Sequence, residues 1–162
     1  MKRAAILIPF LIGCGIRPAP VPPVKSIDVR IVSELSNEQT KRIVDIAREY
    51  LAGSGIETRE LDDCSGCLHI GIKSKPLWRS FVGFQGWFSP TANTILVYAG
   101  VSNDYSGKIL AHEIGHALGC PHELRGLMHN PLLSSPFIWP LDGVDFATGY
   151  SDKCTKIMRG EK

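Results

Sequence analysis

The chain has 162 residues, of which 44% are hydrophobic, and its formal net charge is +2. This length and apolar content suffice for one globular domain with a single hydrophobic core. The small net charge gives no reason to expect nucleic acid as a partner, and we expect a monomer.

The first 13 residues have the pattern of a signal peptide. Met1-Lys2-Arg3 is a basic lead, and residues 4–13 are an apolar run too short to span a bilayer as a helix. Leu-Ile-Gly followed by Cys14 resembles the bacterial lipobox, which implies cleavage before Cys14 and acylation of that cysteine. The alternatives are an ordinary secretory signal and a short anchor with an incidental cysteine.

Residues 14–25 form a predicted tether, because four prolines follow one another closely between Arg17 and Val24. Such a segment favours extended conformations and would hold the domain roughly 20–30 Å from the lipid, at about 3 Å per residue. Gly15 stands where aspartate would signal inner-membrane retention, so the outer membrane is favoured in a Gram-negative cell. In other bacteria the chain would lie on the outer face of the plasma membrane.

A strand and an amphipathic helix are predicted next. Residues 26–33 alternate apolar and polar side chains, which indicates a half-buried strand. Ser36 and Asn37 are N-cap candidates for a helix that reaches Ala52 and stops at Gly53. Its apolar stripe consists of Ile43, Val44, Ile46, Ala47, Tyr50 and Leu51.

Three more strands are predicted, with an aromatic stretch before the last of them. Residues 56–61 and 67–73 are the second and third strands, and residues 94–98 form a short apolar strand. Residues 81–88 are rich in glycine and aromatic side chains, and residues 89–93 contain the turn signals Pro90 and Asn93.

A metal-binding helix is predicted from about Ser106 to Leu118, after a loop over residues 100–106. His112, Glu113 and His116 fit the pattern H-E-x-x-H, in which both imidazoles lie on one helix face and can hold one zinc ion. The glutamate then projects beside them toward the open side of the metal.

A third ligand follows directly. Gly119 can end the helix in a left-handed conformation, and the chain then turns so that His122 comes back to the metal. Three protein ligands and one free position are typical of a catalytic zinc site. Met128 lies six residues beyond His122 and would be an ordinary core residue but for that position.

H-E-x-x-H-x-x-G-x-x-H followed by a methionine is the metzincin signature, so the chain resembles the metzincin zinc peptidases. The short step from His122 to Met128 is most similar to the matrixins. The serine typical of matrixins after the third histidine is missing, and Glu123 occupies its place as in astacins. Asn130 stands where astacins have a zinc-associated tyrosine, which favours a divergent, minimal, matrixin-like member.

This resemblance implies an α+β domain over residues 26–162, with a twisted, mixed five-stranded sheet and two long helices. The upper subdomain would be residues 26–119. The lower subdomain, residues 120–162, would carry the methionine turn, a pocket wall at residues 130–139 and a final helix over residues 144–158. The antiparallel edge strand of metzincins, to which extended substrates add as a strand, would lie at Gly83, Phe84, Gln85, Gly86 and Trp87. The alternative is a core hairpin in which Phe84, Trp87 and Phe88 are packing residues.

Four further cysteines in a secreted chain predict two disulfides, for which three connectivities exist. The favoured pairs are Cys64 with Cys67 and Cys120 with Cys154. A redox-active or metal-binding C-x-x-C pair is the alternative for the first two cysteines.

These features predict a zinc-dependent endopeptidase that acts on peptide or protein substrates, with Glu113 as general base and then general acid. The alternative is a non-catalytic zinc-binding lipoprotein that serves as a binding or adhesion module. Asp62 and Asp63 hint at calcium, although such pairs are mostly loop charges. Glu123 could orient a ligand, but a solvated residue is the favoured interpretation.

Overall fold

The computed structural model describes residues 25–74, 86–99, 102–123, 126–128 and 149–161. Five strands form one sheet in the order β2-β1-β3-β5-β4, in which every neighbouring pair is parallel except the antiparallel β4 and β5. The strands are β1 Lys25–Ser33, β2 Ile56–Glu60, β3 Leu68–Ser74, β4 Gly86–Ser89 and β5 Thr94–Ala99. The helices are α1 Asn37–Gly53, α2 Asn103–Ala117 and α4 Asp152–Arg159. The predicted α+β class, with a mixed five-stranded sheet and two long helices, is confirmed.

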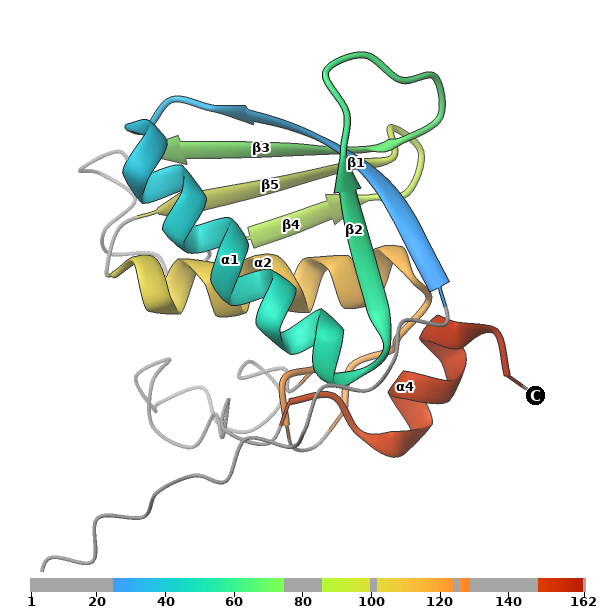
Figure 1. The fold of residues 1–162 in the computed structure, drawn as a ribbon. Coiled ribbons are helices and arrows are strands. Elements are labelled where there is room, and N and C mark those ends of the chain that lie inside the picture. The colour runs from blue at the N-terminus through green and yellow to red at the C-terminus, as the bar shows by residue number, and fades with distance from the viewer. Residues whose placement is uncertain (1–24, 75–85, 100–101, 124–125, 129–148, 162) are drawn as a thin grey trace, which may run out of the picture.

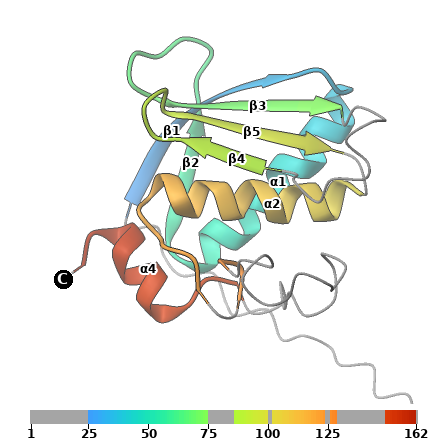
Figure 2. The same cartoon turned by 180° about the vertical axis from the view of Figure 1, so that it is seen from behind.

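Both long helices lie on the same side of the sheet, as the two opposite views show (Figures 1 and 2). The core lies between them and the sheet, because the strands alternate: Ile70 and Ile72 of β3 are buried, whereas Lys73 is exposed. From α2, Leu110 and Ile114 enter the same core. Each such side chain contributes roughly 1.5–3 kcal/mol of transfer free energy on full burial.

The two long helices approach closely at Gly107 of α2. A Cβ atom there would come within 2.6 Å of the Ile46 Cβ and 2.8 Å of the Ile43 carbonyl oxygen, both in α1. The glycine therefore sets the depth at which the metal-motif helix lies against α1 and the sheet.

Two helix starts differ from the sequence prediction. The helix α2 begins at Asn103 rather than Ser106, because the Ser102 side chain caps it by accepting a hydrogen bond from the Tyr105 amide at 3.1 Å. Ser106 is fully buried inside the first turns instead of preceding them. The helix α4 begins at Asp152 rather than near residue 144, because Ser151 is its N-cap.

Both favoured disulfides, Cys64–Cys67 and Cys120–Cys154, are present in the structure. The Cys64–Cys67 bond leaves no free thiolate for a metal in this pair; because a disulfide is also the oxidised form of a redox-active pair, that alternative stays open. The second bond joins the segment after α2 to α4, which are 34 residues apart in sequence.

Several predictions fall outside the described residues. They concern the signal peptide and tether with Cys14, the edge-strand residues Gly83, Phe84 and Gln85, and the pocket wall at residues 130–139. Within the described ranges, no helix is long and apolar enough to cross a bilayer.

Candidate metal centre

The metal motif is built by the end of α2 and by the turn that follows it. His112 and His116 lie one helical turn apart, and Gly119 has φ +94°, the left-handed conformation that favours glycine. The Gly119 amide donates to the His116 carbonyl at 3.0 Å, and the Cys120 amide donates to the Gly115 carbonyl at 2.9 Å. This pair of bonds is the Schellman motif, which ends the helix and turns the chain so that His122 faces it.

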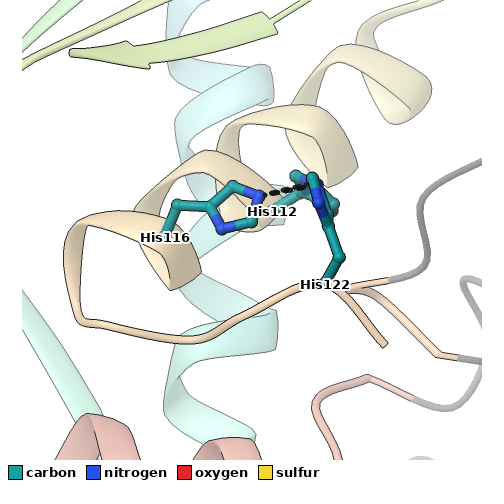
Figure 3. Close-up of side chains that lie close together, drawn as sticks. All are labelled: His112, His116 and His122. Carbon is teal, nitrogen blue, oxygen red and sulfur yellow. Dashed lines mark hydrogen bonds between the residues drawn. The ribbon is translucent and has the colours of Figure 1, made fainter. Parts of the chain in front are cut away.

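The three imidazoles point toward one another (Figure 3). The His116 Nε2 atom lies 3.1 Å from Nε2 of His112 and 3.0 Å from Nε2 of His122. One ring nitrogen of each histidine lies within 4.8 Å of the others, so the group is able to hold a metal ion. The structure thus brings all three predicted ligands together.

Backbone carbonyls fix which nitrogen of the helical histidines carries a proton. His112 Nδ1 lies 2.6 Å from the Leu127 carbonyl oxygen, and His116 Nδ1 lies 2.8 Å from the Cys120 carbonyl oxygen. A carbonyl only accepts, so each Nδ1–H donates and each Nε2 presents a lone pair.

Two lone pairs that face each other at 3.1 Å repel, unless a cation lies between them. The donor set therefore fits a metal ion. Three imidazole nitrogens, two of them on rings whose other nitrogen donates to a backbone carbonyl, match the ligand preference of zinc.

Burial also favours the neutral, ligand-competent form of His116. Desolvation lowers the pKa of this imidazole, although its hydrogen bond to the Cys120 carbonyl acts in the opposite direction. Neutral imidazole is the form that binds metal.

Glu113 is buried beneath β4, next to the histidine pair. A Cβ atom on Gly86 would lie 2.5 Å from Ile109 Cγ2 and 2.8 Å from Glu113 Oε1, so a larger residue at that position of the strand would displace these side chains. Desolvation raises the pKa of Glu113 to about 7, and a hydrogen bond with the Phe88 backbone partly opposes the shift. In the absence of metal, the carboxyl group is thus poised to gain or lose a proton near neutral pH.

Buried side chains pack against α2 at Gly115, and the sequence predicted only some of the residues involved. Met128 and Leu127 are fully buried, and a Cβ atom on Gly115 would come within 2.6 Å of the Met128 Sδ atom. The same Cβ would lie 2.9 Å from Cε1 of Tyr150, whose hydroxyl donates to the Ala111 carbonyl. Gly115 and Tyr150 were missed, although a glycine inside a predicted helix was an available signal.

The strand β4 is the last strand of the sheet and lies antiparallel to β5, as expected for the substrate edge. Gly86 and Trp87 belong to it. The core-hairpin interpretation is wrong for Trp87, whose side chain is 53% exposed, but it holds for Phe88, which packs against the core.

The favoured interpretation of Glu123 as a solvated residue is wrong. Its Oε1 atom accepts a hydrogen bond of 2.7 Å from the Ser151 hydroxyl, and the side chain is half-buried. Asp62 and Asp63 are exposed, and the metal-capable group within the described residues is the histidine group alone.

No protein-family model matches the sequence, and no curated protein sequence is similar to it. Two solved structures match this chain at low identity. High choriolytic enzyme 1, a hatching enzyme zinc-protease from the medaka fish Oryzias latipes, is 13% identical, covers 85% of this chain and 90% of its own, and has a TM-score of 0.50. Myroilysin is 17% identical, covers 86% of this chain and 79% of its own, and has a TM-score of 0.45. The likeness to the hatching enzyme shows a shared fold.

Proposed function

We propose that the chain is a zinc-dependent endopeptidase, divergent and matrixin-like in its motif spacing, held at the bacterial cell envelope by a lipid. One observation carries the proposal. The three imidazoles point toward one another, with one ring nitrogen of each within 4.8 Å of the others, and the carboxyl group of Glu113, next to His112 in the chain, is buried. The hatching enzyme with the similar fold is a zinc-protease, which supports the same chemistry.

His112, His116 and His122 would hold the zinc ion. Bound zinc supplies a Lewis acid and a water nucleophile at neutral pH. The Glu113 carboxylate takes the proton of the attacking water and delivers it to the leaving amine nitrogen. Burial raises the pKa of the metal-free carboxyl group above its usual value, which favours its role as a proton carrier.

Peptide substrates would bind along β4. This strand is at the edge of the sheet and lies over Glu113 at Gly86, so its backbone donors and acceptors are next to the site. An extended peptide that pairs with the edge would place its scissile bond beside the carboxylate. Exposed Trp87 offers apolar and aromatic surface to such a peptide.

The test is peptide hydrolysis by the purified full-length chain and by its Glu113→Ala variant. We expect the variant to retain one zinc per chain and to lose activity by roughly 10²–10⁴-fold, because the general base is removed. Glu57→Ala is the matched control, since Glu57 is an exposed glutamate on the opposite edge strand β2. It should retain full activity.

Chelation should abolish hydrolysis by the parent chain, and added zinc should restore it. Undiminished hydrolysis by the pure Glu113→Ala protein would refute the role of the carboxylate. A chain that binds zinc but cleaves no member of a diverse peptide library would instead be the non-catalytic binding module.

A further inference from the structure

The third ligand, His122, differs from the other two in how it is held. His112 and His116 are fixed by the helix α2 and by the Leu127 and Cys120 carbonyls. His122 is exposed and lies in the segment after the helix ends. The position of its backbone depends on what fixes that segment.

Two links tie this segment to the first turn of α4, one on each side of His122. Cys120, two residues before it, is disulfide-bonded to Cys154. Glu123, the next residue, accepts a hydrogen bond of 2.7 Å from the Ser151 hydroxyl. Ser151 and Cys154 are themselves joined, because the Ser151 Oγ atom accepts from the Cys154 amide at 3.1 Å.

Glu123 is also held through its backbone. Its amide donates to the Met128 carbonyl at 2.9 Å, which closes the turn from the third histidine to the methionine. The carboxylate lies at the N-terminus of α4, where the helix dipole favours a negative charge. Backbone and side chain together leave the residue after His122 little freedom.

We propose that Glu123 is a positioning residue for the metal, which orients the His122 imidazole through its hydrogen bond with the Ser151 N-cap of α4. The proposal rests on the metal site of the proposed function but not on hydrolysis. The Cys120–Cys154 disulfide fixes the chain before His122, and the Glu123 side chain fixes it after His122. Removing the carboxylate breaks the link to Ser151, and the backbone bond to Met128 alone then holds the residue after His122.

The experiment measures zinc affinity by chelator competition on the purified full-length chain without reductant, so that the disulfides stay intact. The variants are Glu123→Ala, Glu123→Gln, Ser151→Ala and the double variant Glu123→Ala/Ser151→Ala. Cobalt substitution provides a second readout, because the visible spectrum reports the geometry of the ligands. Ser36→Ala is the matched control, since Ser36 caps α1 in the same way, with its side chain accepting from the Gln39 amide at 3.3 Å.

We expect Glu123→Ala to weaken zinc binding by about 10–100-fold, the usual effect of removing a residue that orients a metal ligand, and to alter the cobalt spectrum. Glu123→Gln should keep the zinc affinity and the cobalt spectrum of the parent chain, because the glutamine amide oxygen accepts the same hydrogen bond. The double variant should bind zinc no more weakly than whichever single variant binds it less tightly, since both changes break the same Glu123–Ser151 hydrogen bond. Ser36→Ala should lower thermal stability without changing zinc affinity.

Unchanged affinity and spectrum in Glu123→Ala would overturn the proposal, and so would losses that multiply in the double variant. Equal losses of affinity in Ser36→Ala would also overturn it, because they would show a general effect of stability. A parent chain that binds no zinc would instead refute the proposed function itself.

Discussion

Gly115 lies between the two helical histidines, at the point where three parts of the chain meet. The Met128 side chain and the Tyr150 ring pack against it from below, at distances that leave no room for a Cβ atom. The Leu127 carbonyl, next to Met128 in the chain, is the partner of His112 Nδ1. The glycine therefore allows the methionine turn to approach the helix closely enough to fix that ligand.

Gly115→Ala should destabilise the protein by about 1–3 kcal/mol, because the added methyl group would overlap the Met128 side chain and the Tyr150 ring. Helix propensity alone would give the opposite sign, a gain of about 1 kcal/mol. Urea denaturation measures the difference. Gly53→Ala is the control. Gly53 is the last residue of α1, and nothing lies within 4 Å of a Cβ atom added there, so this variant should be as stable as the parent or slightly more stable. A Gly115→Ala protein as stable as the parent would show that the Met128 and Tyr150 side chains can move to accommodate the methyl group.

The sequence predicted the residues that face the metal but not the groups that hold them. His112, His116 and His122 follow from fixed spacings and from one glycine turn, which are local properties. The Leu127 carbonyl on His112 and the Ser151 hydroxyl on Glu123 are contacts made by tertiary packing, whereas the Cys120 carbonyl reaches His116 through the turn that ends α2. Residues 28 positions apart in sequence, such as Glu123 and Ser151, give no periodic signal of their contact.

At the scale of elements, four of the strands and the start of α1 at Ser36 were predictable, whereas the starts of α2 and α4 were not. Both Ser102 and Ser106 are suitable N-caps by residue type. The choice of Ser102 depends on packing, since Ser106 and Gly107 are buried and Gly107 lies against α1. The start of α4 at Ser151 likewise coincides with its bond to Glu123, which lies outside the helix.

The helix α4 is short, and its stability depends on its attachments. It is bonded to the end of the metal motif by Cys120–Cys154, and Arg159 donates to the Ser54 carbonyl at the end of α1 at 2.8 Å. A helix of 8 residues is marginal alone in water. The disulfide therefore stabilises α4, whereas α1 and α2 are stabilised by their larger buried faces.

Removing the Cys120–Cys154 disulfide by a double change to alanine should cost about 4 kcal/mol, from the loop entropy of its 34-residue separation. The Cys64–Cys67 pair closes a separation of 3 residues and should cost about 2 kcal/mol when removed in the same way. Denaturant unfolding of the zinc-free proteins checks this order and keeps metal binding out of the comparison. Equal losses would contradict the loop-entropy account.

Considered as a whole, the molecule separates its two ends from the candidate substrate edge. The Lys25 Nζ atom, at the start of β1, donates to the Met158 carbonyl of α4 at 2.9 Å, so the two ends of the described domain lie side by side (Figure 1). In the sheet, β3 and β5 lie between β1 and the edge strand β4. A tether that enters at β1 would thus leave β4 open to substrates.

Cys14→Ser should move the protein from the membrane fraction to the soluble fraction, because a cysteine thiol and its new amino group would carry the acyl chains. Fractionation of cells fed a labelled fatty acid measures both the location and the loss of label. Peptidase activity per mole should stay unchanged, since β3 and β5 lie between β1, where a tether would enter, and the candidate substrate edge β4. Gly15→Asp is the companion variant: it keeps the acylated cysteine and, in a Gram-negative cell, should retain the labelled protein at the inner membrane. If Cys14→Ser stayed in the membrane fraction, the apolar segment before it would be an uncleaved anchor rather than a signal peptide.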